Sequence, residues 1–203
     1  MQLADSAMPI GSAAHSFGLE TMIAEERLTA DSLPSFLNGW LEETGIVEAA
    51  FCRAAHRLAG AEWEALNQQL SARKPAHESR TASLTLGRRF LQLFQALEGA
   101  PGPAQDAHYA VAFGYAARVL GIQEELATAG CLQQTVTAMV SACQRLMPLG
   151  QHLAARLLWD LKPAILAAAR AAESAGLETA AFTPLVEIAS MRHVDLTTRL
   201  FIS

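Results

Sequence analysis

The sequence predicts an all-α protein, a single-domain helical bundle of about eight to ten helices that spans residues 1–203. Three observations lead to this prediction. Aromatic residues make up only 6 % of the chain, long β-branched runs are absent, and leucine and alanine recur at helical spacing. A chain of this length suits one domain and buries roughly 70 % of its extended surface on folding. We therefore expect a sizeable hydrophobic core.

Apolar spacing and helix-start signals give the expected helices in chain order. They cover residues 17–27, 31–58, 62–70, 77–97, 106–120, 124–146, 148–172 and 183–192. Pro148 fits the first position of the seventh helix, and Thr183-Pro184 is expected to cap and start the last one, with Glu187 in its first turn. Pro163 cannot donate to the carbonyl of Trp159, which predicts a kink.

Two breaks in the pattern need interpretation. Gly45 falls inside the helix expected over 31–58, where it costs about 1 kcal/mol relative to Ala and is consistent with close helix packing. The stretch Gly99-Ala100-Pro101-Gly102-Pro103 is the clearest interruption in the chain. Because both sides of this stretch have the same composition, we interpret it as a loop within one bundle.

Composition excludes several classes of protein. The formal charge is −5 without a long basic run, which argues against nucleic-acid binding. No apolar run reaches about 18 residues and the start carries no signal peptide, so we expect a cytoplasmic protein without a membrane span. Three scattered cysteines do not make a disulfide framework. With 51 % hydrophobic and 17 % charged residues, part of the surface is expected to be covered by a partner.

The segment from Asp5 to Glu20 is the least helix-like part of the chain. Pro9 fixes its own φ angle, and Gly11 and Gly18 allow a tight turn or a close approach. The segment has few charges and several apolar groups, unlike a disordered leader. We expect an ordered N-terminal loop that packs against the body and leads into the first helix.

No motif of high chemical specificity is present, and we predict no catalytic, cofactor-binding or metal-binding residues. Cys52 and His56 share a helical face at i and i+4, but a metal site needs two further ligands, and a buried thiol beside a surface histidine is the simpler interpretation. His15 beside Ser16 resembles a proton-transfer pair without an assignable base or oxyanion hole. We interpret His15 as a structural residue that satisfies the loop backbone.

Four segments together resemble the urease accessory protein UreF family. They are the opening loop, with Asp5–Gly11 and His15–Glu20, then His108–Gly114, Arg145–Gln151, and Thr183–Ile188 continuing through Met191 and His193 to Arg199–Ser203. Each segment alone is weak. Their order across nearly the whole chain is specific.

The resemblance implies an all-α, non-catalytic protein, commonly a homodimer, that acts in maturation of the nickel enzyme urease. Such proteins bind the accessory protein UreD, also called UreH, and recruit the GTPase UreG, and the complex delivers nickel to the urease apoprotein. In the family, the N-terminal loop and C-terminal tail become ordered at the UreD contact, and the dimer face receives UreG. Residues carried over as partner-binding are Pro9, Gly11, His15, Ser16, Gly18, Glu20, His193, Arg199, Leu200, Phe201 and Ser203.

Two other functions stay open at this point. The chain could carry nickel directly, through His15, Cys52, His56 or His193. It could also be an all-α enzyme or small-molecule-binding protein, which would need a deep pocket with convergent polar groups. The sequence does not identify such groups.

Overall fold

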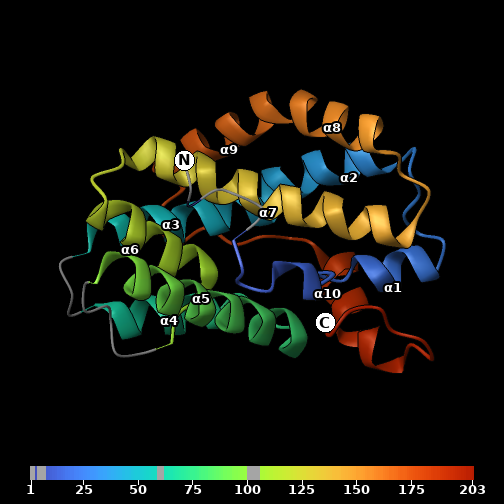
Figure 1. Ribbon diagram of the computed structural model, residues 1–203, viewed down its shortest axis with the longest axis horizontal. Coiled ribbons are helices and arrows are strands. Elements are labelled where there is room, and N and C mark those ends of the chain that lie inside the picture. The colour runs from blue at the N-terminus through green and yellow to red at the C-terminus, as the bar shows by residue number, and fades with distance from the viewer. Residues whose placement is uncertain (1–2, 4–7, 59–61, 100–105) are drawn as a thin grey trace.

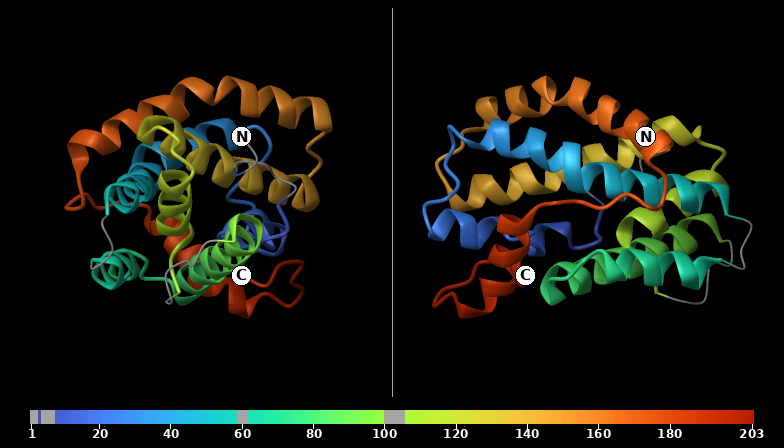
Figure 2. Two further views of the ribbon diagram at one scale, coloured as in Figure 1. Left: turned by 60° about the vertical axis from the view of Figure 1, so that its left-hand side comes forward. Right: turned by 180° about the vertical axis from the view of Figure 1, so that it is seen from behind.

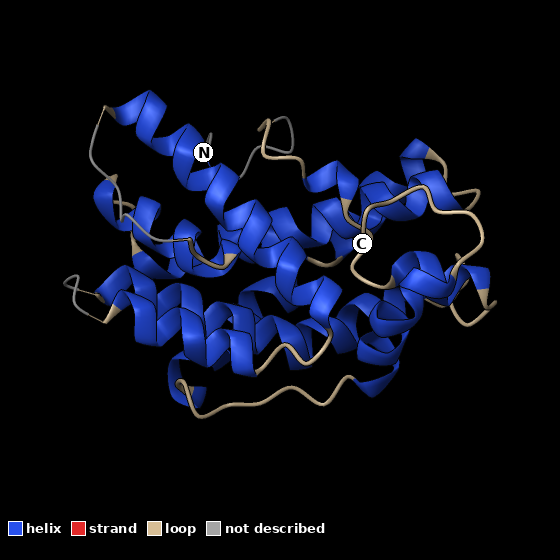
Figure 3. Ribbon diagram, turned by 90° about the horizontal axis from the view of Figure 1, so that it is seen from below, coloured by secondary structure: helices blue, strands red, loops and turns tan. Residues whose placement is uncertain are grey.

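The computed structural model describes residues 3, 8–58, 62–99 and 106–203, and these residues form helices joined by loops, without a strand (Figures 1 and 3). The predicted all-α fold is confirmed. The helices are α1 (Leu19–Ala24), α2 (Leu33–Trp40), α3 (Ile46–Arg57), α4 (Trp63–Ala72), α5 (His77–Glu98), α6 (Tyr109–Val119), α7 (Glu124–Leu146), α8 (Gln151–Asp160), α9 (Lys162–Ala175) and α10 (Pro184–Arg192).

The expected helix over 31–58 is interrupted by a π-helical turn, Leu41–Gly45, that joins α2 to α3. Gly45 keeps helical backbone angles, and a Cβ atom there would lie 3.4 Å from the carbonyl oxygen of Trp40. This oxygen and the other near atoms belong to the same helical segment and lie at ordinary van der Waals distance, so among the described residues the close packing against another helix that the glycine suggested is not found. The Gly99–Pro103 loop lies mostly outside the described residues, but α5 does end at Glu98, with Gly99 in the left-handed conformation at φ 65°.

One expected helix start is wrong, at Pro148, whereas α10 does start at Pro184 but lacks the expected side-chain cap. Pro148 does not begin a helix, because the chain turns back after it: the Leu149 N–H donates to the carbonyl of Met147 at 2.7 Å, and Gly150 is extended at ψ 154°. The helix starts instead at Gln151. At α10, the Thr183 side chain does not cap the helix; its hydroxyl lies 3.2 Å from that of Thr44.

The break expected from Pro163 is confirmed, since α8 ends at Asp160 and α9 begins at Lys162. Proline occupies the second position of α9, where a missing backbone N–H costs no helical hydrogen bond. Helices α8 and α9 therefore form a bent outer layer above α2 and α7 (Figures 1 and 2).

Helices α3 and α7 lie between two hydrophobic clusters and contribute side chains to both. One cluster joins α3 to α4, α5 and α6 and is rich in aromatic rings, with Phe90 stacked on Phe113 at 5.6 Å between centroids. The other joins α1, α2, α8 and α9 to α7 and is mostly aliphatic. Phe201, near the C-terminal end, is buried in this second cluster, so the tail belongs to the core.

His108 joins three helices at the start of α6. Its ring nitrogens lie 2.8 Å from the hydroxyl of Ser71 on α4 and 3.0 Å from that of Ser83 on α5, and its backbone N–H donates to Asn67. Burial, with Lys74 and then Arg80 nearby, lowers the pKa of His108 to about 3. A neutral ring satisfies both hydroxyls because each serine can donate or accept.

Candidate partner-binding site

The N-terminal loop is ordered and packs against α10, as expected. A short 3₁₀ turn, Ser12–Ala14, follows Gly11, and Gly18 at φ 83° precedes α1. A Cβ atom on Gly18 would lie 3.0 Å from the carbonyl oxygen of Val186 on α10. Gly18 therefore allows both the left-handed turn and the close approach of α10.

The loop pairs with the C-terminal tail through backbone hydrogen bonds. Ser16 donates its N–H to the carbonyl of Ser203 at 2.5 Å, and Ile202 donates to the carbonyl of Ala14 at 2.8 Å. His15 Nδ1 lies 2.7 Å from the Ser203 hydroxyl, so its partner is the tail and not the loop backbone that we expected. Burial, followed by the charge of Arg89, lowers the pKa of His15, which favours a neutral ring.

Glu20 on α1 is the central acceptor of the site. Its side chain is 5 % exposed, and its carboxylate accepts from the backbone N–H of Leu200 at 2.6 Å and of Phe201 at 3.2 Å. The same carboxylate lies 2.8 Å from Nε2 of the buried His193. A buried carboxylate with these three partners fixes both the end of α10 and the tail.

Two residues that the sequence did not assign to the site complete this arrangement. Glu78 on α5 lies 2.9 Å from Nδ1 of His193, on the other side of the ring from Glu20. Arg145, at the end of α7, donates to the carbonyl of Ala13 at 2.6 Å, and its guanidinium lies 4.4 Å from the centroid of the Phe201 ring. Arg145 thus contacts loop and tail together.

The structure brings the expected site residues together, but it buries most of their side chains. His15, Ser16, Gly18, Glu20, His193, Phe201 and Ser203 are buried, and Gly11 is half-buried. Pro9, Arg199 and Leu200 are exposed. The buried residues hold the loop and tail in place, whereas direct contact with a partner is open to the exposed ones.

Exposed apolar side chains follow one another along α10 and the tail. We call them the C-terminal apolar surface: Leu185, Ile188, Met191, Val194, Leu200 and Ile202. The first four recur every three residues, and neighbours at that spacing touch on a helical surface. The sequence does carry a signal for them, because α10 is apolar on more than one side and only part of it can face the core.

Neither a metal-binding cluster nor a membrane-spanning helix is found among the described residues. Cys52 is fully buried, and His56 Nε2 bonds to the carbonyl of Ile122 at 2.7 Å, so the two side chains do not act as a ligand pair. Within the described ranges, no three His, Cys, Asp or Glu residues are grouped so that they could hold a metal ion. No helix in the described part of the chain is long and apolar enough to cross a membrane. The candidate site therefore consists of exposed apolar side chains on α10 and the tail, and buried hydrogen bonds hold these two segments in place.

Comparison with known proteins identifies the family. Residues 28–162 match the UreF family model. The chain belongs to the UreF family. It is 31 % identical to the urease accessory protein UreF of Paenarthrobacter aurescens, over 100 % of this chain and 96 % of that protein. It is 33 % identical to the protein of the same name from Microcystis aeruginosa, over 99 % of this chain and 95 % of the relative.

The ranges matched in these comparisons differ in whether they include the N-terminal loop and the tail. The matched range ends before the tail and begins after the loop, whereas the similarity to individual UreF proteins extends across both. The relatives are named as accessory proteins of urease, so a role in urease maturation is supported for this family member.

Proposed function

We propose that this UreF family member is a non-catalytic scaffold for nickel delivery to urease, acting in the cytoplasm as a homodimer. It binds a UreD/UreH-type accessory protein and recruits the GTPase UreG, and the assembled complex delivers nickel into the urease apoprotein. The proposal includes an influence of the scaffold on GTP hydrolysis by UreG. Nickel is the cargo of this complex.

The C-terminal apolar surface is the observation that supports this proposal best. Leu200 is 57 % exposed although its own backbone N–H is bonded to the buried Glu20. The chain therefore holds an apolar side chain at its surface in a fixed position. Preorganised, exposed apolar groups are typical of a surface that buries them against a partner, because less conformational entropy is lost on binding.

The proposed partner contact can be tested by co-purification and calorimetry with a UreD-type protein. Removing residues 199–203 should abolish binding, while circular dichroism of the truncated chain stays helical. A sharper variant is Ile188→Asp, which leaves the buried contacts of Glu20 and His193 unchanged and places a charge on the C-terminal apolar surface. We expect at least a tenfold loss of affinity, because burying an unpaired carboxylate is costly.

Leu153→Asp is the matched control, since Leu153 is also an exposed aliphatic side chain but lies on α8 in the outer layer. It should leave UreD binding unchanged. Equal losses for Ile188→Asp and Leu153→Asp, or unchanged binding after truncation, would contradict the assignment of the partner surface to α10 and the tail.

A further inference from the structure

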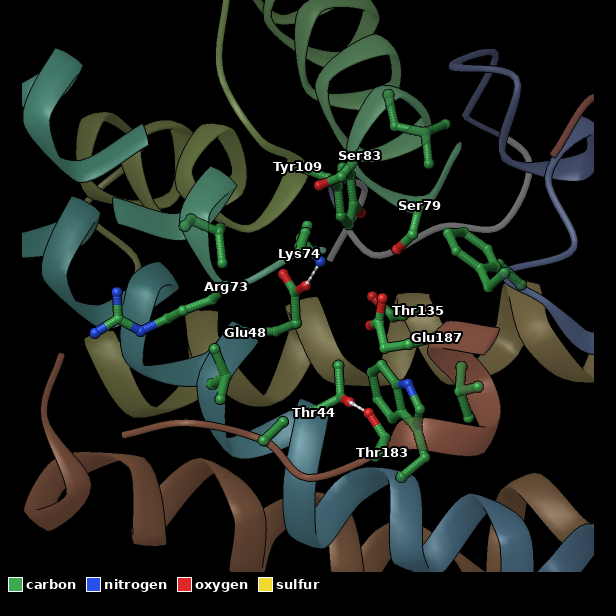
Figure 4. A pocket seen from close by; sticks show the side chains of 18 of the residues that line it. Thr44, Glu48, Arg73, Lys74, Ser79, Ser83, Tyr109, Thr135, Thr183 and Glu187 are labelled. Atoms are coloured by element: carbon green, nitrogen blue, oxygen red, sulfur yellow. Dashed lines mark hydrogen bonds and ion pairs between the residues drawn. The ribbon is translucent and has the colours of Figure 1, made fainter. Parts of the chain in front are cut away.

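A cavity of about 130 Å³ lies between the N-terminal loop, the C-terminal segment and the helical bundle (Figure 4). Ile10 and Phe17 of the loop line it, as do Thr183 and Glu187 from the start of α10. A single water needs at least about 10–15 Å³ of such space, so the cavity has room for several waters or one small organic molecule.

Two of the charged residues around this cavity neutralise each other. Lys74, which is buried, forms an ion pair with Glu48, and both side chains are nearly inaccessible to solvent. Arg73 also lines the cavity, but its guanidinium donates to the carbonyls of Leu177 and Thr179 and lies over the ring of Phe51. Figure 4 shows the Arg73 head turned away from the other labelled side chains. The Lys74–Glu48 pair therefore adds no net charge, and the Arg73 guanidinium is directed to the carbonyls of Leu177 and Thr179.

Glu187 supplies a further negative charge. Its Oε2 accepts from the backbone N–H of Ala76 at 3.1 Å, at the start of α5, and none of the ion pairs among the described residues includes it. Figure 4 shows the side chains of Ser79, Thr135 and Glu187 directed toward the same space, so oxygen acceptors gather there.

Aromatic rings form the rest of the recognition chemistry. Phe17, Trp40 and Tyr109 line the same cavity, from the loop, α2 and α6. A cation over an aromatic face is attracted by the ring quadrupole, and a nearby carboxylate adds to this attraction. From this combination we infer that the cavity binds a small organic ammonium cation, with its charged head beside Glu187 and its alkyl groups against the aromatic walls.

Binding at this position couples to the partner-binding site. The cavity exists only while the loop and the C-terminal segment are docked, because both contribute walls, and the hydroxyls of Thr44 and Thr183 hold that segment to the bundle at 3.2 Å. A ligand that binds only the docked state stabilises it by mass action. The inference does not rest on the proposed role in urease maturation, because ligand binding is measured on this chain alone.

The test uses the full chain and choline as the probe, with its neutral isostere 3,3-dimethylbutan-1-ol as the matched ligand. Both are titrated by calorimetry and by heteronuclear NMR at constant ionic strength. We expect choline to bind with a dissociation constant of about 1 mM or below, roughly −4 kcal/mol. The neutral isostere should bind at least tenfold more weakly, and amide shifts should map to Phe17, Trp40 and Thr135.

Two variants and one control test whether choline binds in this cavity and not through the overall charge of the chain. Glu187→Gln should weaken choline binding at least fivefold while retaining an oxygen acceptor for the Ala76 N–H. Ala138 also lines the cavity, so Ala138→Leu should fill it and remove binding. Glu42→Gln, which removes an exposed carboxylate elsewhere, should leave the affinity unchanged. Absence of choline binding, equal binding of the neutral isostere, or the same loss in Glu42→Gln would overturn the inference.

Discussion

Glu20→Gln is the most informative single change, because it alters the central acceptor of the loop and tail without changing its shape. The carboxylate accepts two backbone N–H bonds and faces His193, and hydrogen bonds to a charged acceptor contribute about 1 kcal/mol more than bonds to a neutral one. Both carboxylate oxygens accept, whereas a glutamine amide keeps one accepting oxygen and presents its NH2 group at the other position, so the loss over the three contacts is at least about 3 kcal/mol. The tail can open locally, so the loss should appear in tail docking and not in global unfolding.

Native-state hydrogen exchange measures that loss directly. The amides of Leu200 and Phe201 should exchange roughly a hundredfold faster in Glu20→Gln, since 1.36 kcal/mol corresponds to a factor of ten. Amides in the middle of α7 should keep their protection. Glu42→Gln serves as the control for loss of one surface charge, and it should behave like the unmodified chain.

Two results would refute this reasoning. Unchanged tail protection in Glu20→Gln would mean that the carboxylate does not hold the tail. Equal loss of protection in the tail and in α7 would mean that Glu20 supports the whole fold and not the docking of one segment.

Three further changes test other contacts of the structure. In urea unfolding, Gly114→Ala should lower the free energy of unfolding by several kcal/mol, because the new Cβ atom would lie 2.1 Å from a backbone carbonyl oxygen. The matched variant Gly39→Ala has open space around it and should be neutral or stabilising by up to about 1 kcal/mol. His108 has a folded pKa of about 3 against 6.5 in the unfolded chain, so its contribution to stability is lost as the pH falls below 6.5, by at most about 1.4 kcal/mol per pH unit. In His108→Gln the urea midpoint should therefore depend less on pH between 6.5 and 4.5, and an unaltered pH dependence would contradict this assignment. Arg145→Met should raise the hydrogen-exchange rate of the Ile202 amide about tenfold, because one hydrogen bond and one cation–π contact are lost. An unchanged rate would mean that Arg145 does not hold the loop and tail together.

Local pattern was enough to predict most of the fold. Apolar spacing and proline positions gave the helices and the break near Pro163, because these signals act within a few residues. The wrong start and the missing cap come from contacts that the pattern does not show. The Leu149 N–H bonds back to Met147 before α8 begins, and the Thr183 hydroxyl bonds to Thr44 instead of capping α10.

Long-range partners could not be predicted in the same way. Glu78 and Arg145 reach the site from α5 and α7, and nothing in the spacing around either residue points to the loop or the tail. The loop and tail residues themselves were found only through resemblance to a family. Their burial in this structure follows from contacts across more than 170 positions of the chain, such as that between Glu20 and His193.

Nickel bound to urease is the measurement that tests the central claim most directly. It should be determined, with urease activity and apoprotein abundance, in cells that lack only this chain. The account predicts inactive, nickel-poor urease at normal abundance, restored by the full chain but not by the chain without residues 199–203. Fully active, nickel-loaded urease in the absence of the chain would contradict it.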